Sequence, residues 1–330
     1  MEQKLSESVN GSNSNGIGDA WFDAERNSKR NARKAFSRIG ISLTLIALVT
    51  FAVQIIVQIA LELIGYADWS ESTEGLFILS FVPLYCIAVP IGLLVMKKTP
   101  SVYLKKAKLG AKNYLVFFLM CIPLTYIGNL VGIMISGIAS GGSASNALNE
   151  YVSDVSIFQV LVMVVLAPII EEFIFRKQLI DRTVRYGEGT AILLSGLTFA
   201  LFHTNMFQFF YAFALGLLFA YIYVRTGRLR YVISLHMIIN FMGSIVSSLV
   251  LSLAEKGEFG MFISGMYSLL VLGLIIWGMV LLIKRRKRFK CFPAECELPK
   301  KQVFQIAYLN VGMIIFILFF LAATVLSVVS

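Results

Sequence analysis

The feature that most constrains this chain is a series of unbroken apolar segments, each about 20 residues long, separated by short polar loops. An α-helix of about 20 residues crosses the ~30 Å hydrocarbon core of a bilayer, where backbone polar groups must be satisfied within the segment. Hydrophobic residues make up 58% of the 330 residues, which is more than a soluble domain can keep from water. We therefore predict an all-α, polytopic membrane helix bundle.

The expected crossings can be read directly from the apolar segments. They cover residues 39–60, 76–96, 114–138, 157–175, 206–224, 231–253, 261–283 and 303–329. A shorter apolar segment, 190–203, predicts a short or partial span. The bundle is therefore expected to contain about eight or nine transmembrane helices.

The loops alternate in charge along the whole chain. Lys and Arg gather at 26–38, 97–112, 176–185, 225–230 and 284–301, whereas acidic residues mark the intervening loops at 62–74, 150–154 and 255–258. Such alternation is typical of cytoplasmic and external loops, so the N-terminus is expected in the cytoplasm and the C-terminus outside. The net charge of +10 thus reflects topology, and we expect no nucleic-acid partner.

The polar N-terminal segment, residues 1–38, combines a Ser/Asn/Gly-rich stretch with a basic section. This composition predicts a disordered cytoplasmic tail that ends in a membrane-flanking helical turn. The first apolar segment is expected to be a retained anchor, because no short apolar core with a small-residue cleavage site precedes it.

Three ionisable residues end the fourth apolar segment: Glu171, Glu172 and Arg176. Each charged group at membrane depth costs at least ~2.5–3.5 kcal/mol, so such groups usually have a function. In a helix, Glu172 shares a face with Arg176, whereas Glu171 is turned about 100° away. This spacing predicts an ion pair between Glu172 and Arg176 and leaves Glu171 as a candidate general base. The alternative is a charge cluster where the helix leaves the membrane.

The chain contains only two histidines, His203 and His236, and both lie in apolar segments. His203 alone could cap a helix or lie at the membrane interface. His236 and Asn240 share one helix face and could be polar contacts between helices. Together with Glu171, however, these groups from three helices can meet only in a common interior cavity.

Two chemistries fit such a cavity. Glu171, His203 and His236 could bind zinc with water in the open position. Alternatively, Glu171 could activate water directly while His203, His236 and Asn240 donate hydrogen bonds to the oxyanion. The sequence has no His-Glu-x-x-His zinc motif, and Ser195-Gly196 and Ser234 offer only fragments of a serine-nucleophile motif.

The motifs Glu-Glu-x-x-x-Arg (171–176), Phe-x-x-x-His (199–203) and His-x-x-x-Asn (236–240) follow one another in this order. The chain thereby resembles the CPBP family of CAAX-protease and bacteriocin-processing intramembrane peptidases, also called the Abi family. The resemblance implies that Glu171 activates water, that Glu172 and Arg176 support it, and that His203, His236 and Asn240 line the site. It also implies a peptide or lipidated-protein substrate within membrane lipids.

On this basis the chain divides into four parts. Residues 1–38 are the tail, 39–156 the N-terminal membrane helices, 157–250 a CPBP-like catalytic core, and 251–330 the C-terminal helices with a basic cytoplasmic loop. A location in a bacterial plasma membrane is expected from the resemblance.

One difficulty concerns depth. Straight spans place Glu171 and His203 roughly 10 Å apart in depth, and either helix tilt or a turn at Thr204-Asn205 within the bilayer would close this gap. Because His236 follows Arg230 closely, we expect the site to open toward the cytoplasm.

Two other functions remain open at this point. The protein could be a non-catalytic membrane immunity factor or regulatory scaffold, which acts through binding. A small-solute carrier would also explain buried charges, although no internal repeat supports this reading.

Overall fold

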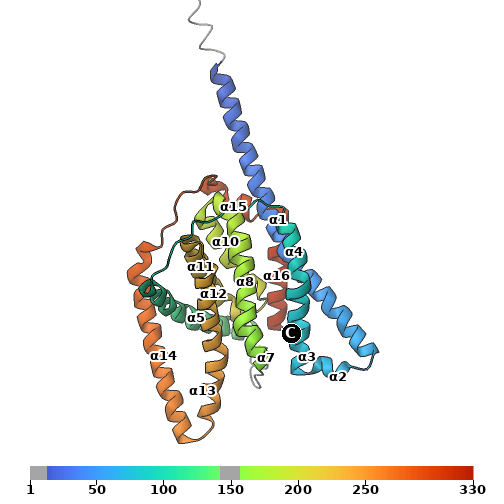
Figure 1. Cartoon of the computed structure of the whole chain (residues 1–330), viewed down its shortest axis with the longest axis vertical. Coiled ribbons are helices and arrows are strands. Elements are labelled where there is room, and N and C mark those ends of the chain that lie inside the picture. The colour runs from blue at the N-terminus through green and yellow to red at the C-terminus, as the bar shows by residue number, and fades with distance from the viewer. Residues whose placement is uncertain (1–12, 142–156, 330) are drawn as a thin grey trace, which may run out of the picture.

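The computed structural model describes residues 13–141 and 157–329, in which the regular elements are all helices and no strand occurs. Figure 1 shows a bundle of upright helices from which the first helix projects at the top. The α-helices are α1 (Asn13–Leu63), α2 (Ala67–Glu71), α3 (Thr73–Val82), α4 (Val89–Met96), α5 (Ala111–Ala139), α7 (Ile157–Val160), α8 (Ala167–Glu172), α9 (Leu179–Thr183), α10 (Glu188–Phe202), α11 (Met206–Thr226), α12 (Leu229–Asn240), α13 (Ser247–Ala254), α14 (Glu258–Arg285), α15 (Lys300–Ala307) and α16 (Val311–Val329).

Short helical turns of other types join several of these helices. The π-helical turns are η1 (Pro83–Ala88), η2 (Leu161–Leu166), η3 (Phe173–Gln178) and η5 (Phe241–Val246), and the 3₁₀ turns are η4 (Val184–Tyr186) and η6 (Arg286–Arg288). The predicted all-α membrane bundle is therefore confirmed.

The number of full spans is smaller than expected. In the described part, six helices are long and apolar enough to cross a membrane, or up to seven if the pair α15 and α16, bent by 68°, is one span. The expected span at 190–203 is α10, whose 15 residues reach only about 22 Å. The segment expected at 157–175 is helical but is divided by η2 and η3, and it is not among the six.

The N-terminal tail also differs from the expectation. Residues 1–12 lie outside the described part, but α1 already begins at Asn13 and continues into the first span. No proline occurs before Pro83, so nothing in the covalent chain breaks this helix. Near the membrane the helix is anchored, because Arg33 donates to Leu309 O and Arg38 donates to Lys98 O. The prediction of a disordered tail is corrected for residues 13–38.

Helices α1 and α16 cross at a pair of glycines. A Cβ on Gly312 would lie 1.8 Å from Ser37 O, and a Cβ on Gly40 would lie 2.3 Å from the Gly312 carbonyl carbon. The backbones therefore touch directly, as in other small-residue crossings of membrane helices. This contact fixes the last helix against the first.

The centre of the bundle is α10, which packs against α11 through a second pair of glycines. A Cβ on Gly216 would lie 3.0 Å from Gly196 Cα. On its other side α11 contacts α5, where a Cβ on Gly128 would lie 2.6 Å from Tyr211 Cα. Helix α10 is thus held close to its neighbours, and its C-terminal residue Phe202 and the following His203 lie deep in the bundle.

The close α1–α16 crossing makes a prediction. Gly312→Ala is expected to lower stability by about 1–3 kcal/mol, because the added methyl group meets backbone atoms that cannot move aside. The midpoint of thermal unfolding in detergent should fall by several degrees. Gly273→Ala on α14 is the matched control, since a Cβ there meets nothing within 4 Å. Equal midpoints for the two variants would contradict the crossing.

Candidate active site

Four π-helical turns surround one region of the bundle, and each carries or adjoins a candidate site residue. Tyr85 lies in η1, Met163 in η2 and Arg176 in η3, while Asn240 directly precedes η5. A π-turn inserts an extra residue into a helix and is frequent at functional sites. These turns rotate the side chains that follow them, so they adjust which groups face the common interior.

Glu172 and Arg176 form the predicted ion pair. Arg176 Nη2 donates to Glu172 Oε1 at 3.2 Å, and Arg176 Nε lies 2.9 Å from Glu172 Oε2. Both side chains have no exposed surface. Arg176 Nη1 also donates to Ser195 Oγ at 3.0 Å, and Ser195 in turn donates to Phe175 O at 2.8 Å. Ser195 therefore supports the arginine and is not placed as a nucleophile.

Aromatic rings enclose the buried guanidinium. Its Cζ lies 4.7 Å from the ring centre of Phe199 and 5.9 Å from that of Phe219. A cation over a desolvated ring is attracted by about 2 kcal/mol or more, which offsets part of the loss of hydration. Phe199, the first residue of the second motif, thus helps to keep Arg176 charged and in place.

His236 lies between the two glutamates. Its Nδ1 is 3.0 Å from Glu172 Oε1, and its Nε2 is 3.7 Å from Glu171 Oε2. Because the ion-paired Glu172 is an acceptor, Nδ1 of His236 carries the proton of this bond, and Nε2 is the ring nitrogen that faces Glu171. Glu172 therefore orients the imidazole that faces Glu171.

Glu171 is the more accessible of the two carboxylates. Its side chain is 20% exposed, whereas that of Glu172 is 0% exposed. Tyr85 donates its hydroxyl hydrogen to Glu171 Oε1 at 3.3 Å. This bond occupies one carboxylate oxygen and leaves Oε2 on the side of His236.

Tyr85 is a site residue that the sequence reasoning missed. It lies in the second apolar segment, 86 positions before Glu171, and belongs to none of the three motifs. The available signal was weak: a tyrosine within an apolar span requires a partner for its hydroxyl group. Nothing in the sequence names that partner.

The turn after α10 brings His203 to the site. Thr204 has a φ of 48°, in the left-handed region that β-branched residues rarely adopt, and Asn205 then caps α11 by accepting a hydrogen bond from Phe207 N. The chain thus reverses at 203–205, as predicted. Strain of this kind, of order 1–3 kcal/mol, is often found at functional sites.

His203 is held by its own helix and by Phe199. Its Nδ1 lies 2.8 Å from Phe199 O, and its ring packs on the edge of the Phe199 ring at 4.7 Å. The same Phe199 ring contacts His236, with 5.8 Å between the ring centres. The two histidines therefore flank one phenylalanine, and the second of them, His236, is the one that reaches Glu171.

Asn240 makes a different contact from the one expected. Its Nδ2 donates to Met163 O at 3.0 Å, in the π-turn η2. The freed carbonyl groups of a π-turn need such donors. One amide hydrogen of Asn240 therefore joins α12 to η2 by a hydrogen bond. Only the second amide hydrogen is left to donate to a bound ligand.

The donor chemistry and the placement of the proposed zinc ligands point in different directions. Both histidines have Nδ1 directed at an acceptor, Phe199 O or Glu172, which leaves Nε2 free as in many metal-binding histidines. In the described part of the chain, however, no three His, Cys, Asp or Glu side chains meet closely enough to hold a metal ion. As placed, Glu171, His203 and His236 do not form a metal-holding group.

The segment that carries the site is similar to a known family of membrane protease domains. Residues 153–242 match the family described as "Type II CAAX prenyl endopeptidase Rce1-like", which falls in the CPBP (Abi) family. The matched segment contains all three motifs but not Tyr85. No curated protein and no solved structure matches the chain significantly.

The chain therefore has the helices of an integral membrane protein, and its residues 153–242 are similar to the Rce1-like family. This family consists of CAAX proteases, hydrolases that act on prenylated or peptide substrates in membranes.

The buried ion pair makes a second prediction. Arg176→Leu is expected to destabilise the protein by about 3–5 kcal/mol, because Glu172 would remain buried and charged without its partner. The double variant Glu172→Gln/Arg176→Leu should recover most of this loss, since no unpaired charge is left and the amide oxygen still accepts from His236. Denaturant unfolding in detergent measures both, with the exposed Arg30→Leu as control. If the double variant were as unstable as Arg176→Leu, lost packing and not the unpaired charge would explain the loss of stability.

Proposed function

We propose that the protein is an intramembrane endopeptidase in which Glu171 is the general base. The observation that supports this most directly is the position of His236 between a fixed and an accessible carboxylate. Glu172 is neutralised by Arg176 at 2.9 Å and has no exposed surface, whereas Glu171 Oε2 remains accessible. A poorly solvated carboxylate with a free oxygen is suited to accept a proton from water.

The proposed reaction needs only water and the peptide. Water attacks the carbonyl carbon of the scissile bond while its proton passes to Glu171 Oε2. The tetrahedral oxyanion then collapses, the C–N bond breaks, and Glu171 returns the proton to the leaving nitrogen. The products are a carboxylic acid and an amine, and Glu171 ends in its starting state.

The surrounding groups have separate tasks in this scheme. Neutral His236 accepts a hydrogen bond at Nε2 and can orient the attacking water, but it can stabilise an oxyanion there only as imidazolium, because Nδ1–H is used by Glu172. The second amide hydrogen of Asn240 is a donor for the oxyanion. Tyr85 is a positioning residue that fixes the Glu171 carboxylate.

The substrate is proposed to be a peptide, or the C-terminal segment of a lipidated protein, that enters from the membrane. The domain family and the interior position of the site support this class of substrate. We place the protein in a bacterial plasma membrane with its N-terminus in the cytoplasm, as the alternation of loop charge favours.

The assignment of the base can be tested directly. Glu171→Gln is expected to reduce cleavage by about 10²–10⁴-fold, the usual contribution of a general base, with unfolding behaviour unchanged. Purified protein in liposomes is incubated with a mixed pool of plain and farnesylated peptides, and new termini are identified by mass spectrometry.

Glu258→Gln, at the exposed first residue of α14, is the matched control and should cleave as the wild type does. If Glu171→Gln gave the same products at the same rate, Glu171 would not be the base. A second outcome concerns the whole enzyme. If wild-type protein produced no new termini, and cells that carry Glu171→Gln behaved as wild-type cells do, a binding role such as a regulatory scaffold would replace the enzyme.

The direct mechanism also predicts the effect of metal removal. Purified protein should contain less than stoichiometric zinc, and a chelator should leave cleavage unchanged, because the three candidate ligands do not meet as a group. Elemental analysis of the protein, read beside cleavage with and without chelator, measures this. Zinc near one equivalent, lost together with activity, would instead assign Glu171, His203 and His236 as ligands.

A further inference from the structure

A cavity of about 750 Å³ adjoins the site between α5 and the continuous α12–η5–α13 segment. It reaches Asn240 and Met163 at one end and Glu255 at the other. Tyr211 also lines it, and its hydroxyl oxygen accepts a hydrogen bond from Gln208 Nε2 at 2.9 Å. Ligand sites in proteins commonly have volumes of 300–1,000 Å³, so this space is large enough for a peptide segment.

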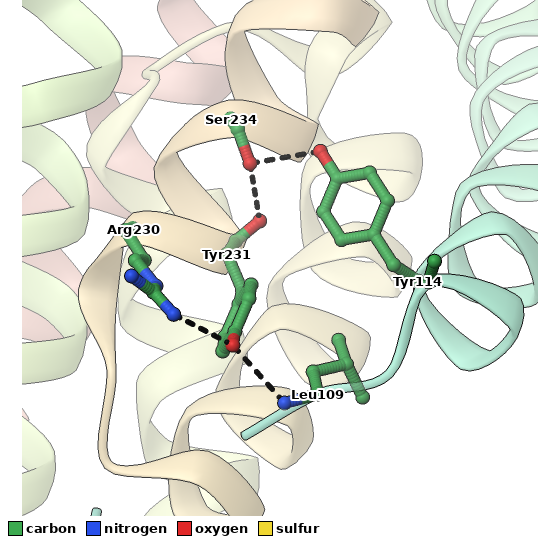
Figure 2. A pocket seen from close by; sticks show the side chains of 6 residues that line it. Leu109, Tyr114, Arg230, Tyr231 and Ser234 are labelled. Atoms are coloured by element: carbon green, nitrogen blue, oxygen red, sulfur yellow. Dashed lines mark hydrogen bonds between the residues drawn. The ribbon is translucent and has the colours of Figure 1, made fainter. Parts of the chain in front are cut away.

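The opposite end of the same helix pair is closed by hydrogen bonds. Figure 2 shows Tyr114 on α5 bonded to Ser234 on α12, with 2.8 Å between their hydroxyl oxygens. Nearby, Tyr231 accepts from Leu109 N at 3.0 Å and from Arg230. A separate shallow pocket of about 520 Å³ lies outside these bonds.

These two features reverse the expected direction of opening. The sequence predicts access from the basic end, near Arg230. The structure instead joins α5 to α12 at that end and leaves a cavity that runs from Asn240 to Glu255. In Figure 1 the turn between α13 and α14, which follows Glu255, lies at the bottom, opposite to α15 at the top.

The lining of the cavity shows what kind of ligand it suits. Ser244, Ser247 and Ser248 each donate to a carbonyl of their own helix, so their oxygens are left as acceptors. Glu255 is exposed at the far end, and no ion pair joins it to any residue in the described part of the chain. The lining is mainly apolar, with the serine oxygens as a polar strip and Glu255 at one end, so the cavity suits an extended peptide whose N–H groups face the serines and whose positive charge lies at Glu255.

We propose that this cavity binds the peptide substrate as an extended segment, with a cationic group of the peptide at Glu255, and that it opens to the Glu255 face of the membrane. Its role as a substrate site rests on the proposed peptidase function. The position of the opening and the preference for a cationic peptide do not depend on cleavage, so both can be tested separately.

The first experiment tests the opening. All four native cysteines are replaced by alanine, single cysteines are introduced, and a membrane-impermeant maleimide is added to either face of sealed vesicles. Thiolates react only where water is present, so lipid-facing positions stay unlabelled. The variants are Ser248→Cys in the cavity, Lys256→Cys and Lys287→Cys as markers of the two faces, and Leu269→Cys as the lipid-facing control.

We expect Ser248→Cys to react from the same face as Lys256→Cys and Leu269→Cys to stay unlabelled. Reaction only from the Lys287 face would overturn the opening, and no reaction from either face in folded protein would overturn the water-filled cavity. Labelling of both face markers confirms that the vesicles and the fold are intact.

The second experiment tests the ligand class by protection of Ser248→Cys in the Glu171→Gln background, which cannot cleave by the proposed mechanism. The probes are two short peptides of serine, asparagine and glycine that differ only in a terminal lysine or glutamate. The lysine peptide should protect at about two- to fivefold lower concentration, the range of an exposed ion pair. Glu255→Lys should reverse this order, and Glu258→Lys, the matched control, should not.

Equal protection by both peptides, or an order that Glu255→Lys leaves unchanged, would overturn the proposed ligand class. Failure of the peptidase proposal gives a different result. In that case wild-type protein makes no new termini, while Ser248→Cys is still labelled from the Lys256 face and still protected by the lysine peptide.

Discussion

The ion pair between Glu172 and Arg176 is the interaction on which the rest of the site depends. Two charges with no exposed surface are tolerated at membrane depth only if each is fully compensated. The compensation comes from Ser195 on α10, from the rings of Phe199 and Phe219, and from His236 on α12. One buried pair therefore requires three other helices to lie where they do, and it holds His236 toward Glu171.

The sequence predicted the contacts within this centre better than those of its surroundings. Helical spacing identified the Glu172–Arg176 pair, and the apolar setting of Glu171, His203 and His236 predicted that they share an interior. The turn at 203–205 was one of the two arrangements, beside helix tilt, that the depth of straight spans led us to expect. Each of these inferences rests on local spacing or on the cost of burying a polar group, and both can be read from a sequence.

The features that were missed depend on contacts between distant segments. Tyr85 reaches Glu171 from another helix, and no periodicity links positions so far apart. The π-turns were not predicted, because regular α-helices were assumed. One of them, η2, contains Met163, whose carbonyl oxygen accepts a hydrogen bond from Asn240. The span count was too high because α10 is apolar but short, and the helical start of α1 was missed because polar composition was taken as disorder.

The position of the cavity along α12 also depends on contacts between distant segments, which the sequence does not show. The sequence places Arg230 just before His236, and proximity along the chain suggested access from that end. In the structure, however, this first turn of α12 is used to bond α5 through Tyr114 and Tyr231, so the short path along the helix is closed. Beyond Asn240 the cavity lies between α5 and the segment η5–α13. Serines of η5 and α13 line it there. A helix that carries a candidate site histidine near one of its ends can thus have a cavity beside its other end, because a cavity forms where packing partners are absent, whatever the distance to the nearest loop.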